Sequence, residues 1–270
     1  MLKSYGVTES AVVATEAERS AEEVRLTGYA VVRGVFDTAR LQAARDKLDR
    51  LYTEQAAVAG GEARLRAIND ANVVRCPLAH DVFFLDLATA PRLRAVAAEL
   101  LGRYVVLQQQ NGVINPPDDR YYQAAWHRDL PYQHFVSSRP LAVSALMCID
   151  PFTNVTGGTH VLPGSHRAEP FPSDGYVLAH ERGIEAEAGD VLVFDSMLFH
   201  RAGTNRSVRP RRGVNNVYGL PFLKQPISLP RALGGRFRDD PDLGRFLGYD
   251  TEPADGPADW RNRRLAAIQG

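Results

Sequence analysis

His127, Asp129 and His200 are the residues of this chain whose types and spacing best support metal chemistry. Two histidines and one carboxylate on one face of a cavity bind Fe(II) and leave other coordination positions open for oxygen and a co-substrate. Side chains at i and i+2 of an extended strand point to the same side, so His127 and Asp129 can reach one ion. His200 follows the apolar run 191–194, where a buried strand would deliver a third ligand. Taken alone, His-x-Asp also fits a solvated ion-pair cluster.

A basic segment at 206–212 follows the second histidine and contains a candidate anion-binding residue. Such a run is usually a solvated face. In a strand that starts here, however, Arg211 and Arg212 face opposite ways, so one of them can point inward. A guanidinium in a dry cavity needs an anionic partner, and its planar fork suits a carboxylate. Either Arg211 or, if the register differs by one, Arg212 can be this inward residue.

The elements that must position these residues can be read from periodicity and turn signals. Helices are expected early in the chain, including an amphipathic helix with one apolar stripe, and strands dominate later. The expected helices cover 9–27, 38–54 and 91–101, and 57–75 is expected to be a loop or short helix. The expected strands cover 29–32, 103–114, 122–128, 141–149, 158–163, 190–195 and 212–219. This order predicts a mainly β fold, a sandwich or jelly roll with helices packed outside.

Composition narrows the possible partners and surroundings. The 32 basic and 32 acidic side chains cancel, so charge gives no reason to expect nucleic acid or an anionic membrane as a partner. Cys76 and Cys148 are too few for a disulfide framework, and no secretory segment is recognisable, so we expect a reducing cytoplasm. No apolar run approaches the roughly 20 residues that span a bilayer. Composition says nothing of the oligomeric state.

Three sequence motifs follow one another along the chain: Trp126 to Asp129, the turn Pro163-Gly164-Ser165-His166, and Gly189 to Arg211. Together they resemble the phytanoyl-CoA dioxygenase family of iron- and 2-oxoglutarate-dependent oxygenases, from about residue 28 to residue 216. The resemblance implies a double-stranded β-helix of the cupin-like, jelly-roll kind. It also implies Fe(II), 2-oxoglutarate and O2. We expect one domain over 1–270, with a helical part at about 1–102, a jelly-roll core at about 103–222 and an extension or lid at 223–270. The extension is rich in Pro, Gly, Arg and Asp, and we favour a solvated extension.

The resemblance assigns His127, Asp129 and His200 to iron and Arg211 to the distal carboxylate of 2-oxoglutarate. Many relatives carry a hydroxyl residue two positions after the second histidine, where this chain has Ala202. Thr204, or a residue of the 105–114 strand, is expected to substitute. Within that strand Gln110 is the chosen cavity-facing residue, with a solvated edge strand as the alternative.

Loops are expected to form the substrate mouth, because loops tolerate the variation that specificity needs. The candidates are 57–75, 130–137 and 223–250. Tyr132 and His134 lie directly after Asp129 with one residue between them, and we expect both to contact a polar organic substrate. The alternative for His134 is an ordinary loop position.

These expectations converge on an Fe(II)- and 2-oxoglutarate-dependent dioxygenase that hydroxylates an unactivated C–H bond. The expected substrate is a small metabolite or a natural-product intermediate. Two alternatives remain open: a non-redox, metal-dependent isomerase or lyase of the cupin sort, and a non-catalytic jelly-roll module that binds a small ligand.

Overall fold

Two antiparallel sheets form the centre of the molecule in a computed structural model that describes residues 5–117, 121–130 and 134–269. The larger sheet has six strands in the order β1-β7-β4-β9-β3-β2, and the smaller has three in the order β6-β5-β8. The strands of the larger sheet are β1 (Tyr29–Val32), β2 (Val73–Arg75), β3 (Val106–Asn115), β4 (Ala142–Cys148), β7 (Val191–Asp195) and β9 (Arg211–Gly219). Those of the smaller sheet are β5 (Thr159–Val161), β6 (Arg182–Gly183) and β8 (His200–Ala202).

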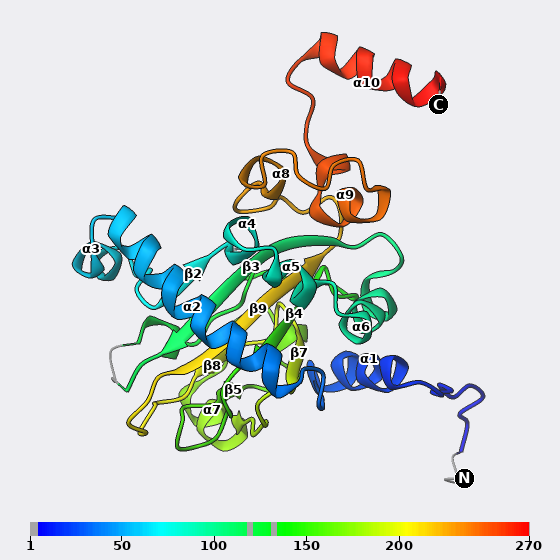
Figure 1. Cartoon of the computed structure of the whole chain (residues 1–270). Coiled ribbons are helices and arrows are strands. Elements are labelled where there is room, and N and C mark those ends of the chain that lie inside the picture. The colour runs from blue at the N-terminus through cyan, green and yellow to red at the C-terminus, as the bar shows by residue number, and fades with distance from the viewer. Residues whose placement is uncertain (1–4, 118–120, 131–133, 270) are drawn as a thin grey trace.

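Helices cover one face of the larger sheet (Figure 1). Helix α2 (Thr38–Val58) lies across this face, and its apolar stripe Leu41, Ala44, Leu48 and Leu51 is buried as predicted. Helix α1 (Glu16–Thr27) begins at a capping box on Thr15 and ends at Gly28, which has the left-handed conformation that glycine tolerates. The expected jelly roll with external helices is confirmed. The other helices are α3 (Glu62–Ala67), α4 (Pro77–His80), α5 (Phe83–Ala88), α6 (Pro91–Leu101), α7 (Asp174–His180), α8 (Leu229–Ala232), α9 (Pro241–Leu247) and α10 (Pro257–Gln269).

Two sequence-based expectations about local structure were wrong. The segment 122–128 is not a strand: it forms a 3₁₀ turn at Tyr122–Ala124 and then a single-residue bridge from His127 to His200. The 57–75 segment is not only loop and helix, because its end is β2, which pairs with β3 from Val73 to Arg75. In both places pairing with a distant strand decides the conformation, and local periodicity cannot report such pairing.

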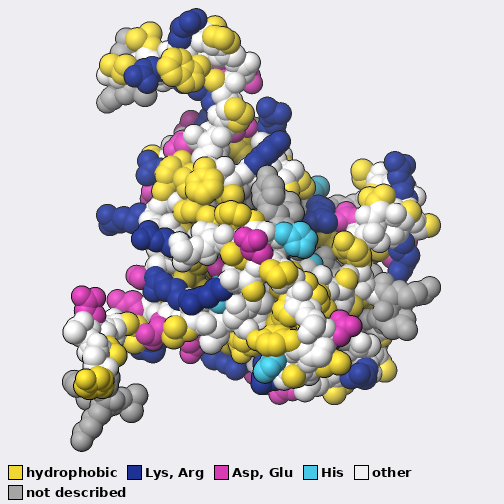
Figure 2. Space-filling model, turned by 180° about the vertical axis from the view of Figure 1, so that it is seen from behind, with side chains coloured by type: hydrophobic (Ala, Val, Ile, Leu, Met, Phe, Trp, Pro, Cys, Tyr) yellow, Lys and Arg dark blue, Asp and Glu magenta, His cyan; other side chains and the backbone are white. Residues whose placement is uncertain are grey.

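The C-terminal extension is only partly solvated. Leu229, Phe246 and Leu247 are buried in the main hydrophobic core, so α8 and α9 belong to the folded body. The favoured solvated interpretation was therefore wrong for this part. Helix α10 does project from the body, with Trp260 and Ile268 exposed (Figure 1). Figure 2 shows this projection from behind, with acidic and basic side chains interspersed over the face in view. Within the described residues, no helix combines the length and apolarity needed to cross a membrane.

Gly112 marks the closest approach of α2 to the larger sheet. A Cβ at this position would lie 2.4 Å from a methyl carbon of Leu48 and 3.1 Å from Val74. Gly112→Ala should therefore overpack the core and lower the free energy of unfolding by about 1–3 kcal/mol. Urea denaturation measures this change. Gly175 in α7 has open space around it, so Gly175→Ala is the control and should leave stability unchanged or slightly raised. Equal effects of the two substitutions would contradict the packing described here.

Candidate active site

His127, Asp129 and His200 meet between the two sheets. The Oδ1 atom of Asp129 lies 3.4 Å from Nε2 of His200 and 3.9 Å from Nε2 of His127. One donor atom from each residue falls within 4.8 Å of the others, a spacing that can hold one metal ion. A pair of backbone hydrogen bonds fixes the arrangement: His127 and His200 each donate an amide to the other's carbonyl at 3.0 Å. The sequence-predicted triad is thus brought together by an antiparallel bridge.

Both histidine rings are oriented so that Nε2 faces the centre of the triad. The Nδ1 atom of His127 lies 2.8 Å from the carbonyl of Ala125, and Nδ1 of His200 lies 3.0 Å from the carbonyl of Leu198. A carbonyl can only accept, so each ring carries its proton on Nδ1 when neutral. The lone pair on Nε2 is then free for a metal, which is the usual orientation of histidine ligands.

The carboxylate of Asp129 is held by two polar side chains from the larger sheet. Its Oδ2 atom accepts a hydrogen bond from the Ser144 hydroxyl at 2.5 Å and another from Nδ2 of Asn215 at 2.9 Å. Oδ1 is left to face the histidines. Sequence analysis missed Ser144 and Asn215. Their signal was a polar residue within each of two otherwise buried strands, β4 and β9.

The electrostatics of the triad favour the deprotonated state of His127 and Asp129, whereas the neighbouring Asp129 outweighs burial and raises the pKa of His200. Burial, together with the neighbouring His200, lowers the pKa of His127 to about 4. Burial alone would raise the pKa of Asp129, but His200, His127 and the Ser144 hydroxyl outweigh it and hold that pKa below its ordinary value. His127 is therefore neutral and Asp129 ionised at neutral pH. Metal binding requires these forms.

Arg211 points into the molecule and Arg212 points out. Arg211 is 2 % exposed, donates to the carbonyl of Gly157 at 2.6 Å and stacks over the Phe152 ring at 4.0 Å. Its Nε atom has no hydrogen-bond partner among the described residues, and burial lowers the pKa of its guanidinium. Arg212 instead pairs with Asp49 and Asp150 on the outer surface. The register expected from the sequence is the one that the structure shows.

A small cavity connects Arg211 with the triad. Tyr121 and Thr159 line it together with His127, Asp129, His200 and Arg211. Thr159 is buried and lies directly across from Ala202 in the β5–β8 pairing. It therefore supplies a hydroxyl beside the position where the family pattern expects one. Tyr121 is buried too, and burial raises its pKa to about 12, so its hydroxyl stays protonated.

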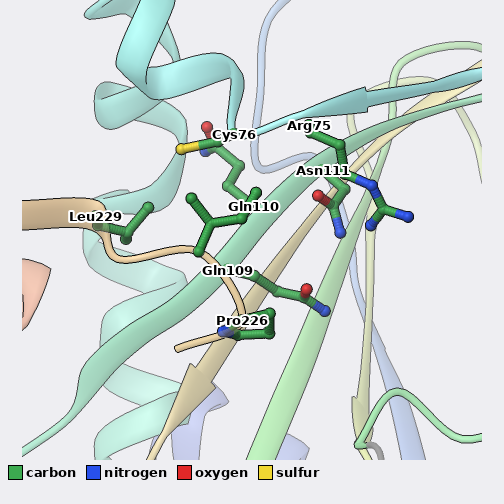
Figure 3. Close-up of a pocket in the computed structure, with 8 residues that line it drawn as sticks. Arg75, Cys76, Gln109, Gln110, Asn111, Pro226 and Leu229 are labelled. Atoms are coloured by element: carbon green, nitrogen blue, oxygen red, sulfur yellow. The ribbon is translucent and has the colours of Figure 1, made fainter. Parts of the chain in front are cut away.

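Two residues expected at the co-substrate lie elsewhere. Thr204 is exposed, outside the cavity. Gln110 turns toward the helical layer: its amide donates to the carbonyl of Phe84 and to Asn216, both at 2.7 Å. Asn216 follows Asn215, and consecutive strand residues face opposite sides of a sheet. Gln109, the neighbour of Gln110, lines the cavity that Asp129 borders, as does Gln108 at the β-bulge between Leu107 and Gln109. Gln110 lines a separate pocket of about 270 Å³ near the β2 edge, where it points toward Cys76 (Figure 3).

The expected substrate contacts are only partly visible. Tyr132 lies outside the described residues, and His134 is exposed. Leu130 and Phe135 from the same 130–137 segment line a second cavity, of about 920 Å³, which also includes Asp129. The residues 222–226 border this cavity as well. Of the 57–75 segment, only Arg75 reaches a described pocket, the smaller one of Figure 3.

The donor set fits Fe(II). Two imidazole nitrogens and one carboxylate oxygen on one side of the ion leave the other positions open, as in non-haem iron oxygenases. The open side adjoins the cavity that ends at the unpartnered Nε of buried Arg211. Residues that orient the ligands are present for each of the three, which metal sites require.

Comparison with known proteins agrees with this geometry. Residues 24–213 match the family model described as phytanoyl-CoA dioxygenase (PhyH). The chain is 34% identical over 227 residues to "Uncharacterized protein Rv1501" of Mycobacterium tuberculosis, covering 82% of this chain and 81% of that protein. It is 29% identical over 197 residues to "Dioxygenase af480" of Aspergillus fumigatus, covering 68% of this chain and 62% of that protein.

Solved structures show the same fold. EctD from S. alaskensis, with 2-oxoglutarate and 5-hydroxyectoine, has a TM-score of 0.60 at 22% identity and covers 80% of this chain and 79% of its own. HygX from Streptomyces hygroscopicus, with nickel and 2-oxoglutarate, has a TM-score of 0.58 at 18% identity, covering 81% and 91%. The jelly roll, the triad and the family match define an Fe(II)- and 2-oxoglutarate-dependent dioxygenase. The chain belongs to the phytanoyl-CoA dioxygenase family.

Asn215 should matter for iron although it is not a ligand. Asn215→Ala removes one of the two hydrogen bonds that orient the Asp129 carboxylate, so Fe(II) affinity should fall by about 10- to 100-fold. Anaerobic Fe(II) titration measures it. Asn154→Ala is the matched control, because Asn154 is exposed and bonds only to Glu185 on the surface. Unchanged iron affinity in Asn215→Ala would show that the carboxylate does not need this support.

Proposed function

We propose that the protein hydroxylates an unactivated C–H bond of a small organic molecule, with His127, Asp129 and His200 holding Fe(II). The observation that carries this proposal is the position of Asp129. It borders both the cavity that ends at Arg211 and the larger cavity of about 920 Å³. Bound Fe(II), supplied with 2-oxoglutarate and O2, provides the oxidising power that removes hydrogen from the substrate. Co-substrate and substrate then approach the ion from different cavities.

The cavity that connects Arg211 with the triad is proposed to receive 2-oxoglutarate. Its far end holds a buried guanidinium that has a carbonyl and an aromatic ring as neighbours but no carboxylate partner among the described ion pairs. A buried cation in such a place is stabilised by an anionic ligand, and a carboxylate matches the guanidinium fork. We assign the distal carboxylate of 2-oxoglutarate to Arg211. Thr159 is proposed to donate its hydroxyl to the same carboxylate, in place of the expected Thr204.

The remaining residues have binding and orienting roles. Ser144 and Asn215 fix the Asp129 carboxylate, and the backbone bridge fixes the distance between the histidines. Val113, Leu146 and Phe194 line the small cavity with apolar surface, which limits water around the co-substrate. The protein thus contributes geometry, a dry site and orientation of one C–H bond, whereas the cofactors supply the redox chemistry.

The two alternative functions, a non-redox isomerase or lyase and a non-catalytic binding module, leave part of the site without a role. A cupin-type isomerase or lyase needs the metal but has no use for a buried guanidinium at the end of a separate cavity. A binding module needs neither. Arg211 therefore favours the oxygenase, and dependence of product formation on 2-oxoglutarate and O2 distinguishes the three.

Arg211→Ala is the direct test of the co-substrate assignment. The substitution removes the partner of the distal carboxylate and should weaken 2-oxoglutarate binding by about 2–5 kcal/mol, which is at least about thirtyfold. Equilibrium binding of 2-oxoglutarate to the anaerobic Fe(II) enzyme measures the loss, and the iron affinity should stay near the wild-type value.

Arg212→Ala provides the matched control, since Arg212 is the neighbouring arginine and makes only outward ion pairs. It should leave 2-oxoglutarate binding unchanged. Weak binding in Arg212→Ala combined with normal binding in Arg211→Ala would reverse the assignment.

A further inference from the structure

The larger cavity, of about 920 Å³, shows which class of substrate the site takes. This volume falls in the range of pockets that enclose drug-sized ligands. The cavity opens onto Asp129, lies against β3 and β9, and is bordered by 128–130 and 222–226. A molecule bound here borders the triad at Asp129, in a cavity that Arg211 does not line. The inference that follows rests on the proposed function, because it concerns the substrate of the same site.

Most of the wall of this cavity is apolar. Leu130, Leu141, Met197, Val217 and Leu223 line it. Three of them, Leu130, Met197 and Val217, belong to one buried hydrophobic cluster, and Leu141 and Leu223 pack at its edge. Apolar walls of this extent favour an apolar ligand body, at roughly 25 cal/mol per Å² removed from water. A sugar or a free amino acid would lose its hydrogen bonds to water there without replacement.

The charged residues at the cavity do not offer a site for a charged substrate group. The guanidinium of Arg128 donates to the carbonyls of Ser165 and Glu169 and stacks over Phe199 at 3.8 Å. It is therefore engaged in holding a neighbouring turn. Lys224 is exposed at the rim, where its charge is solvated. Asp129 belongs to the metal site.

Three glutamines line the cavity, and two of them are engaged: the Gln108 amide donates to the carbonyl of Leu220, and the Gln225 amide donates to those of Leu107 and Leu247. Gln109 is the third. It is half-buried, and its amide has no hydrogen bond to any described residue. Gln109 and Pro226 line both this cavity and the smaller pocket of Figure 3, so they stand where the two spaces adjoin. In Figure 3 the Gln109 amide extends away from Gln110, which points toward Cys76. A primary amide both donates and accepts, and therefore suits a hydroxyl or a carbonyl.

We infer that the substrate is a largely apolar molecule with one neutral hydrogen-bonding group, a hydroxyl or a carbonyl, which Gln109 binds. The apolar body lies against Leu141, Val217 and Leu223, and this places a C–H bond near Asp129 and the ion. The residue proposed to bind this group is Gln109, which lines the cavity, and not its neighbour Gln110, which was expected from the sequence. This substrate class also differs from the polar organic substrate that Tyr132 and His134 had led us to expect.

The test uses two probes of one bicyclic skeleton, decalin and its alcohol decalol, together with the disaccharide trehalose as a polar molecule. Equilibrium dialysis measures their binding to anaerobic enzyme loaded with Fe(II) and 2-oxoglutarate. Wild-type enzyme should bind decalol about tenfold more tightly than decalin, as expected for one hydrogen bond in a dry site, and should not retain trehalose. Gln109→Ala should bind decalol and decalin equally. Leu223→Gln should weaken the binding of both by about tenfold.

Gln42→Ala and Leu178→Gln are the matched controls, because both positions are exposed and lie outside the cavity. Neither should alter probe binding. Retention of trehalose in preference to decalol, no binding of decalol, or an unchanged preference for decalol in Gln109→Ala would overturn the inference. The binding of Fe(II) and 2-oxoglutarate is measured separately without probes. If that binding fails, the proposed function fails; if it is normal while the probe results are negative, only the substrate class is wrong.

Discussion

The backbone bridge between His127 and His200 is the contact on which the site depends. It joins residues 73 positions apart through two hydrogen bonds of 3.0 Å, and it places the two imidazole rings next to each other, with centroids 4.3 Å apart. Asp129 is tied to the same region by its amide, which donates to the carbonyl of Ser196 at 2.9 Å. Backbone hydrogen bonds thus position the main chain of all three ligands, and the side chains of Ser144 and Asn215 then orient the Asp129 carboxylate.

A second constraint is the separation of buried charges. Asp129 is stabilised by hydrogen bonds and the histidines, whereas the Arg211 guanidinium is buried without an anionic partner among the described ion pairs. An arrangement of this kind costs stability in the ligand-free protein. Under the proposed function, a carboxylate of 2-oxoglutarate would neutralise the guanidinium, and the metal cation would neutralise Asp129. The buried guanidinium would then favour an anionic co-substrate in the cavity that it lines.

Much of the fold was predictable, because it depends on patterns that are local in the sequence. The apolar stripe of α2 and the strands 141–149 and 190–195 were identified from periodicity, and the end of α1 was expected at residue 27, where it lies. The conformation of 122–128 was not predictable in this way. Its extended bridge at His127 exists because β8 pairs with it, and β8 itself is too short to give a periodic signal.

In the candidate site, too, some features could be predicted from the sequence and others depend on contacts between distant segments. The triad could be predicted from residue types and spacing, whereas the choice of Arg211 over Arg212 as the inward residue came from the family resemblance. The hydrogen bonds from Ser144 and Asn215 to Asp129 could not be predicted from the sequence. These two residues come together only because β4 and β9 pair. Gln110 was misplaced because alternation gives two faces but not which of them faces the cavity. A β-bulge between Leu107 and Gln109 adds a further shift that no periodicity reveals.

The central claim is that one Fe(II) is held by two histidines and one carboxylate. The most direct measurement is anaerobic Fe(II) titration of the wild-type protein and of His200→Ala, in parallel with His180→Ala, an exposed histidine outside the triad. The account predicts one tightly bound Fe(II) per chain in the wild type and in His180→Ala, with binding grossly weakened and turnover lost in His200→Ala. Wild-type iron affinity and activity in His200→Ala would contradict it.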